Sequence, residues 1–556
     1  MNSQRTPVRS STLSVALLAL ISHAHAEQPP QANSVTAADI PFTENKQPWF
    51  RPSYLHSLYS PLPAVIHPSK IPLVIPKFEL FPNNVGIGGN YQPNGAVVTA
   101  NNAFFQSLGT NGRSCVTCHQ PSNALSVTTE HVRAVFAATK GRDPLFAPVD
   151  GANCPNQVPE AETSGALLGG RVGSGKQTDL RAAYSQLLDK GLFRIFLPVP
   201  KQTQGTNPQP VEFSIELVSD PNGCNTDPAY NQVIDPSTGE VTQIVSIYRR
   251  PLITSNLKFK TTTLANFPGS GVPPIDLRTG EPLPVDPLTG QFVSRNIMWD
   301  SRDLTLQDQA VNAVLIHSQA SVPPTNEQVL QMLAFQNGIF SAQEVLRTVG
   351  LSRSGANGGS QFLSARPPSS VLAPIPPFIE YDAWNNLTPA TPNEELQASI
   401  ARGQDAFNHI NFGFRFGNAV AQSCATCHGQ QGGGNEATAA GQRNTGVGGQ
   451  SVLSNGPAPD PTLPIFKLTC RDGVRPSGDG PVVTTNDPGL ALVTGRCTDI
   501  GSFTVPTIRS LASRAPYFHD GSAKTVMDIV NFYGKLAINA FTVQQKEDLV
   551  NFLTAL

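Results

Sequence analysis

The sequence contains two copies of the five-residue pattern Cys-x-x-Cys-His, at residues 115–119 and 424–428. Two thiols at this spacing can form thioether bonds to the two vinyl groups of one haem, and the adjacent His can ligate its iron. A thioredoxin-like redox pair needs no trailing His, and a zinc site would need ligands that neither motif offers nearby. The pattern therefore predicts two covalently bound c-type haems. Their attachment and proximal residues are Cys115, Cys118, His119, Cys424, Cys427 and His428.

Both motifs follow stretches typical of short helices that pack an aromatic side chain against a haem. Phe104 and Phe105 precede the first motif, and residues 401–407 precede the second. Only 14% of the 556 residues are charged, whereas 50 are Pro and 46 are Gly, so long regular helices cannot dominate. We therefore expect a mainly α fold with long irregular loops, built from two cytochrome c-like haem domains. The first domain is expected to carry a large insertion with some β structure.

The N-terminus resembles an export signal. Arg5 and Arg9 precede an apolar run at residues 13–21, and Ala24-His25-Ala26 has the small-x-small pattern of a cleavage site. The run is shorter than the roughly 20 residues that span a membrane, which disfavours the alternatives of a membrane anchor or a core helix. We predict a signal peptide at residues 1–26 and a protein without membrane attachment after cleavage. It would be periplasmic in a Gram-negative bacterium, or secreted.

Changes in composition divide the remaining chain. Residues 27–95 are rich in Pro with little periodicity, and residues 352–377 are dense in Ser, Gly and Pro, as in a linker. Strand-like stretches at 192–199 and 211–218 indicate the insertion. The formal charge of −2 argues against nucleic acid as a partner. The predicted parts are the N-terminal extension 27–95, the first haem domain 96–350 with an insertion at about 141–291, the linker 351–384 and the second haem domain 385–556.

Four cysteines remain outside the haem motifs, and an exported chain can join them in disulfides. Four cysteines allow three connectivities. Two of them precede the second haem motif and two follow it, which favours Cys154 with Cys224 and Cys470 with Cys497. Both segments are rich in Pro, Gly and Asn, as expected of insertions without a large core of their own. The alternative is that the four thiols are free and buried.

Segments outside the motifs resemble the bacterial di-haem cytochrome c peroxidase superfamily, whose relatives include MauG and the haem-containing rubber oxygenases. They are residues 299–310, beginning Trp-Asp-Ser-Arg, and the C-terminal stretches 503–509 and 515–522. The resemblance implies that hydrogen peroxide reacts at the N-terminal haem and that the C-terminal haem stores or passes electrons. It also implies a donor, either a small redox protein such as a cytochrome c or a cupredoxin, or an oxidisable protein substrate.

The resemblance assigns roles near the first haem. In the family, a Trp that matches Trp299 lies between the haems and relays electrons; the alternative is a core Trp. In the register of the peroxidases, Gln319 stands where they use a catalytic Glu, and a Gln can orient peroxide but cannot deliver a proton. His317 could supply the missing proton, or could be structural. His131 is a candidate distal ligand of the same haem, or a surface His.

The second haem and a calcium ion receive candidate ligands in the same way. Classical members of the family use a Met as the sixth iron ligand of the second haem. Counted from His519, the corresponding position of this sequence is Tyr533. A helix capped at Thr525 would turn Tyr533 inward, where it is either a ligand as in MauG or a core residue. Met527 and Met332 are the fallback ligands. Asn256 resembles the position that binds calcium in the family, with the carbonyls of Arg514 and Pro516 opposite.

Two other functions stay open. The large insertion favours an oxygenase that acts on a bulky organic substrate. A pure electron-transfer cytochrome would have a second protein ligand on both irons. No Met is close to His119 in the sequence, which favours an open iron position and therefore an enzyme.

Overall fold

The structure is a computed structural model, and the predicted signal peptide lies outside the residues that it describes. Helices make up 34% and strands 19% of the described residues, so the fold is mixed α/β, and the prediction of a mainly α fold is wrong in that respect. In the described part of the chain no helix is long and apolar enough to cross a membrane. The described residues are 72–158, 180–205, 207–235, 237–261, 297–367, 377–412, 414–416, 419–421, 423–430, 433, 442–448, 458–471 and 480–556.

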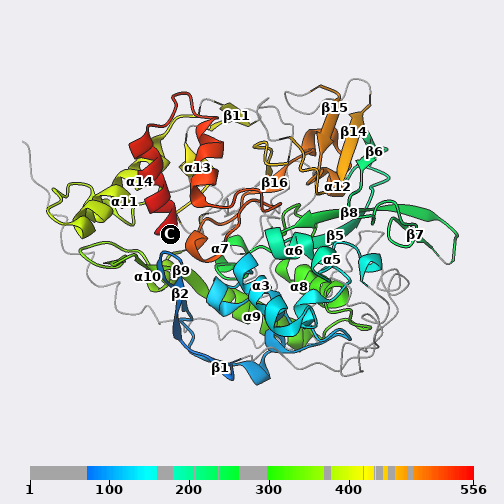
Figure 1. Ribbon diagram of the computed structural model, residues 1–556, viewed down its shortest axis with the longest axis horizontal. Helices are drawn as coiled ribbons and strands as arrows, with labels where there is room; N and C mark the ends of the chain where they lie inside the picture. Colours follow the sequence, from blue (N-terminus) through cyan, green and yellow to red (C-terminus); the bar gives the residue numbers. More distant parts are fainter. Residues whose placement is uncertain are drawn as a thin grey trace, which may run out of the picture. The chain divides into compact units, whose positions relative to one another are not determined.

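The helices are short and several begin at a Thr that caps them. Thr525 accepts a hydrogen bond from Asp528 N, which confirms the helix predicted around Tyr533. The helices are α2 (Cys115–Cys118), α3 (Thr129–Thr139), α5 (Leu180–Ala183), α6 (Ser185–Lys190), α7 (Lys258–Thr261), α8 (Leu306–Ile316), α9 (Asn326–Gly338), α10 (Ser360–Ser364), α11 (Pro392–His409), α12 (Ala491–Thr494), α13 (Val526–Gly534) and α14 (Val543–Thr554) (Figure 1).

The strands form small antiparallel sheets with the orders β1-β4, β10-β9-β3-β2, β11-β12, β13-β16, β15-β14-β6 and β5-β8-β7. Their bounds are β1 (Val74–Ile75), β2 (Phe78–Asn83), β3 (Gly86–Tyr91), β4 (Val97–Val98), β5 (Phe193–Pro198), β6 (Phe213–Ser219), β7 (Gln232–Ile234), β8 (Val241–Arg249), β9 (Phe340–Leu346), β10 (Val349–Gly350), β11 (Phe414–Phe416), β12 (Ala419–Ala421), β13 (Gln442–Arg443), β14 (Ile465–Cys470), β15 (Val482–Thr485) and β16 (Phe503–Thr504).

Several strands lie where the sequence predicts irregular chain. Strands β1 to β3 belong to the predicted extension, and β3 pairs with β9 from Gly86↔Leu346 to Tyr91↔Phe340. Strands β5 and β6 confirm the strand-like stretches of the insertion. Strand β6 pairs with β14, which follows the second haem motif, so this sheet contains strands from both halves of the chain. The predicted disulfides, Cys154–Cys224 and Cys470–Cys497, are both present.

Two hydrophobic cores hold the haem motifs. In the first, Phe104 and Phe105 pack against Phe335 of α9, with ring centroids 4.7 and 4.9 Å apart. In the second, α11 packs closely on α14, because a Cβ at Gly403 would lie 2.0 Å from the carbonyl oxygen of Asp548. The predicted linker also joins this second core, since its Phe378, Tyr381 and Trp384 side chains are fully buried there.

Candidate haem sites

Each Cys-x-x-Cys-His motif folds into a single helical turn that begins with the same hydrogen bond. The backbone N–H of Ser114 donates to Thr117 Oγ1 at 3.1 Å, and the backbone N–H of Ser423 donates to Thr426 Oγ1 at the same distance. The second turn is a 3₁₀ helix at Cys424–Thr426. The four motif cysteines are half-buried free thiols, and each is therefore available for a thioether bond.

Each motif His has one ring nitrogen fixed by a backbone carbonyl. His119 Nδ1 lies 3.0 Å from the Leu125 carbonyl oxygen, and His428 Nδ1 lies 2.6 Å from that of Gly433. A carbonyl can only accept, so Nδ1 carries the hydrogen and Nε2 keeps its lone pair. Burial lowers the pKa of both His residues to about 4, which keeps the imidazoles neutral. Neutral Nε2 is the form that ligates haem iron, so both turns fit a c-type haem.

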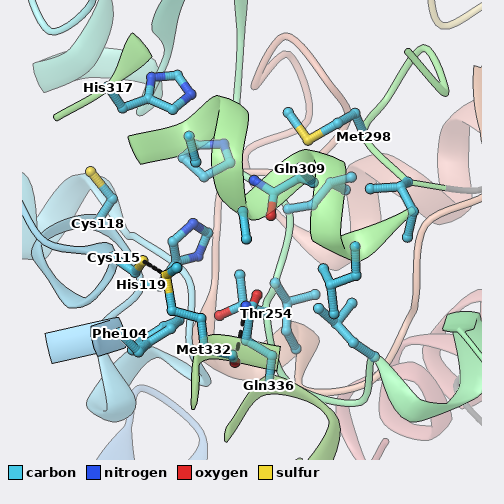
Figure 2. A pocket seen from close by; sticks show the side chains of 18 of the residues that line it. Phe104, Cys115, Cys118, His119, Thr254, Met298, Gln309, His317, Met332 and Gln336 are labelled. Carbon is cyan, nitrogen blue, oxygen red and sulfur yellow. Dashed lines mark hydrogen bonds between the residues drawn. The ribbon is translucent and has the colours of Figure 1, made fainter. Parts of the chain in front are cut away.

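A cavity surrounds the first motif. Phe104, Cys115, Cys118 and His119 line it together with side chains of α8 and α9 (Figure 2). The insertion also reaches this cavity, since Phe193 and Ile195 of β5 line it. A second cavity lies next to His428 and is lined by Phe503, Phe518, Ile529 and Tyr533 among others.

Trp299 lines both cavities. Its side chain is 9% exposed, and its Nε1–H donates to the Arg250 carbonyl oxygen at 2.8 Å. Its ring centroid lies 6.1 Å from that of His519 and 6.4 Å from that of Phe503. An indole in this place contacts the surroundings of both motifs at once.

The half-buried His317 contacts a buried ion pair at the first cavity. His317 Nδ1 donates to Asp150 Oδ2 at 2.5 Å, and Arg113 forms an ion pair with the other carboxylate oxygen. Burial alone would raise the pKa of Asp150, but the Arg113 charge and the hydrogen bonds from both partners outweigh it, and the pKa is lowered. Asp150 therefore stays ionised, holds Nδ1–H and leaves Nε2 of His317 free to exchange a proton. The sequence did not indicate Asp150 or Arg113, because neither belongs to a recognisable motif.

The structure places Gln319 away from the cavity wall. Its Oε1 accepts from Asn111 Nδ2 at 3.1 Å, and its backbone φ is +55°, just past the end of α8. The Gln residues that line the first cavity are Gln309 of α8 and Gln336 of α9. The register of the peroxidases pointed to Gln319, so the sequence did not indicate these two residues.

Two methionines line the first cavity, contrary to the expectation that no Met is near His119. Met332 Sδ lies 3.9 Å from Cys115 Sγ, and Met298 lies on the side of the cavity away from the cysteines (Figure 2). Met332 is thus in the cavity of the first haem motif, which contradicts its proposed place as a fallback ligand at the second. The sequence could not predict this contact, because Met332 follows Cys115 by 217 residues.

Tyr533 lines the second cavity, as the helix pattern predicted. It is half-buried, and burial raises the pKa of its phenol to about 12, against a hydrogen bond with Thr445 that lowers it. Met527, the other fallback ligand, is half-buried on α13 and does not line this cavity in the described part of the chain. Tyr533 is therefore the better placed of these candidates.

His131 and Asn256 make other contacts. His131 lies half-buried on α3 and does not line the first cavity where the structure describes it. Asn256 is buried with φ +63°; its Nδ2 donates to the Ser341 carbonyl at 2.9 Å and its Oδ1 accepts from Ser341 N at 3.0 Å. The carbonyl of Arg514 accepts from Arg250. These contacts use one N–H and one lone pair of the Asn256 amide, and the calcium site stays a prediction.

Two Cys-x-x-Cys-His turns, each with a neutral His beside a cavity, are consistent with two c-type haem sites. Comparison with known proteins narrows the class. The chain is 25% identical over 355 residues to cytochrome-c peroxidase IdrP1 of Denitromonas iodatirespirans, a match that covers 52% of this chain and 87% of the relative. It is 38% identical over 69 residues to cytochrome c551 peroxidase of Nitrosomonas europaea, covering 12% of this chain and 21% of the relative.

Other comparisons add little. No protein-family model matches the chain. The crystal structure of a MauG-like protein associated with microbial copper homeostasis matches at 16% identity and a TM-score of 0.26, covering 54% of this chain and 80% of that one, which is too weak for an argument from fold. The sequence matches show that the chain is a distant homologue of the di-haem cytochrome c peroxidases. This homology indicates an oxidoreductase.

Proposed function

We propose that the protein is an exported di-haem oxidoreductase that reduces hydrogen peroxide in the His119 cavity, with electrons relayed by Trp299 from the His428 side. The observation that carries the proposal is that Trp299 lines both cavities. A haem bound at each motif would supply redox-active iron. The extended π system of the indole suits it to carry an electron between them.

His317 would handle protons in this reaction. Reduction of hydrogen peroxide to two water molecules takes up two electrons and two protons. Because Asp150 holds Nδ1–H of His317, the free Nε2 can take a proton and give it to the leaving oxygen. Gln309 and Gln336, on the same cavity wall, offer amide groups that can orient peroxide by hydrogen bonds. The amide oxygen of Gln319 accepts a hydrogen bond from Asn111, so we propose that Gln319 acts through its neighbours.

A haem bound in the second cavity would store the electrons. Tyr533 is proposed as the sixth iron ligand there, which would favour ferric iron as an anionic oxygen donor does. The donor would be a small redox protein, such as a cytochrome c or a cupredoxin, or an oxidisable protein substrate. We also propose export to the periplasm, on the basis of the predicted signal peptide, and the two disulfides support it. Calcium at Asn256 would use the second lone pair of its amide oxygen, because the first accepts from Ser341 N.

A second candidate function is electron transfer alone. It is favoured by Met298, because a thioether in the first cavity could close the iron position that peroxide needs. The oxygenase alternative is favoured by Phe193 and Ile195, through which the insertion supplies apolar wall to the same cavity.

The relay can be tested by replacing Trp299 with Phe in protein matured with both haems. Phe keeps an aromatic ring but lacks the indole and its hydrogen bond to Arg250. We expect peroxide turnover with a reduced donor to fall, while the absorbance of both haems before peroxide is unchanged. The control variant is Trp384→Phe, which should keep its turnover. Trp384 is a buried Trp that stacks on Tyr381 in the second core and lines neither cavity. Turnover that is equal in Trp299→Phe and the wild type would contradict the relay.

A further inference from the structure

Two arginines border the second cavity beside Trp299. The Arg250 side chain is 5% exposed, and Arg514 is half-buried. Both line the second cavity, and Arg250 lines the first as well. The two residues are joined, because Arg250 Nη2 donates to the Arg514 carbonyl oxygen at 3.0 Å.

The hydrogen-bond partners of both guanidinium groups are neutral backbone carbonyls. Arg250 donates from Nη1 to Lys190 O at 3.0 Å, and from Nη2 to Val127 O at 2.8 Å as well as to Arg514 O. Arg514 donates from Nε to Arg509 O at 3.1 Å and from Nη2 to Thr507 O. A guanidinium has five N–H groups. Three bonds leave two N–H groups on Arg250, and two bonds leave three on Arg514.

Three other arginines that line the first cavity have carboxylate partners. Arg113 pairs with Asp150, Arg249 pairs with two aspartates, and Arg302 pairs with Asp300 at 3.0 Å. In the described residues neither Arg250 nor Arg514 has an ion pair. An uncompensated buried charge is costly. Burial, with the charge of Arg514, lowers the pKa of Arg250 to about 9, and burial lowers that of Arg514 to about 10.

We propose that Arg250 and Arg514 form a carboxylate-binding site that takes a propionate of the haem attached at Cys424 and Cys427. The inference rests on the proposed function, which places that haem in the second cavity. A propionate would supply the missing negative charge, and the unused N–H groups suit the two oxygens of a carboxylate. The Arg250 backbone also accepts the Trp299 Nε1 hydrogen bond, so one residue would position both the relay and the second haem.

The test compares Arg514→Gln with Arg302→Gln, which removes the same charge from a paired arginine of the first cavity. Midpoint potentials of both haems are measured by spectroelectrochemical titration between pH 6 and 8. Arg514→Gln should lower the midpoint potential of the second haem, because a positive charge is lost. The potential should also fall more steeply with pH, because a propionate without its arginine partner takes up a proton when the haem iron is reduced. Tyr517 is the other titratable group acting on the pair, and its pKa is raised to about 12 by burial, outside this range. Arg302→Gln should leave the second haem unchanged.

A second variant and a titration with inorganic phosphate complete the test. Arg514→Lys keeps the charge but loses the planar fork, so its shift should have the same sign and be smaller; no shift in either Arg514 variant would overturn the inference. Equal shifts of both haems would also overturn it, as a non-specific charge effect. So would a wild-type second-haem potential that depends on phosphate at constant ionic strength, which would show an exchangeable anion. Mass spectrometry separates the two proposals, because fewer than two attached haems defeats the proposed function itself.

Discussion

Replacing Asp150 with Asn tests whether His317 is a positioned proton donor or a structural residue. Asn is nearly isosteric but uncharged, and its amide can donate as well as accept. In the wild type the carboxylate fixes His317 Nδ1–H and balances the Arg113 charge. The variant should therefore lose both the fixed tautomer of His317 and the counter-ion of Arg113.

The structure sets the size of both losses. General acid–base catalysis contributes about 10²- to 10⁴-fold, so peroxide turnover should fall by about that factor. Breaking a buried ion pair costs about 3–5 kcal/mol of unfolding free energy. We expect about 3 kcal/mol, because Arg113 keeps its bonds to the carbonyls of Pro144 and Leu145, at 2.7 and 2.8 Å.

The stability loss should depend on pH. The pKa of Asp150 is lowered in the folded protein, so its contribution is complete above the unfolded pKa of about 3.9 and is lost as pH falls through the folded pKa. The wild type and Asp150→Asn should therefore converge in stability at low pH.

Steady-state peroxide turnover and denaturant unfolding are the assays for Asp150→Asn. The matched control is Asp143→Asn, since Asp143 lies in the same segment and caps a 3₁₀ turn through Leu145 N. It should keep both its stability and its turnover, because Asn caps a helical turn about as well as Asp. If Asp150→Asn loses stability but keeps turnover and its pH profile, His317 and Asp150 are structural, and the proposed proton path is wrong.

Three further variants test other parts of the account. Tyr533→Phe should change the absorbance of the second haem and leave that of the first intact; two unchanged spectra would make Tyr533 an ordinary core residue. Met298→Leu should leave the first haem spectrum unchanged, whereas a change in spin state would identify Met298 as an iron ligand and favour electron transfer alone. Removing the Cys154–Cys224 disulfide, which closes a loop of 70 residues, should cost about 4 kcal/mol by the chain-entropy model, measured as unfolding free energy.

Local pattern was enough to predict the parts of the site that depend on a few adjacent residues. The Cys-x-x-Cys-His turns, the cap at Thr525 and the inward face of Tyr533 are set by spacing within one turn or helix. The disulfides also followed from chain order. These features need no knowledge of how distant segments meet.

Contacts between distant segments could not be predicted. Asp150 meets His317 across 167 residues, and no periodicity connects them. Strand β14 pairs with β6 from the insertion, and such pairs add to the strand content that makes the fold mixed α/β. The amide oxygen of Gln319 accepts from Asn111, a contact that spans 208 residues. Each of these outcomes depends on tertiary packing rather than on local preference.

A stopped-flow spectrum of the fully matured protein mixed with one equivalent of hydrogen peroxide would show whether both haems take part in the reaction. We predict that the Soret bands of both haems change together, because peroxide reacts in the His119 cavity and Trp299 couples that cavity to the second. In Trp299→Phe only the first haem should respond promptly. Soret bands that do not change in the wild type would contradict the account and leave a di-haem protein that only transfers electrons.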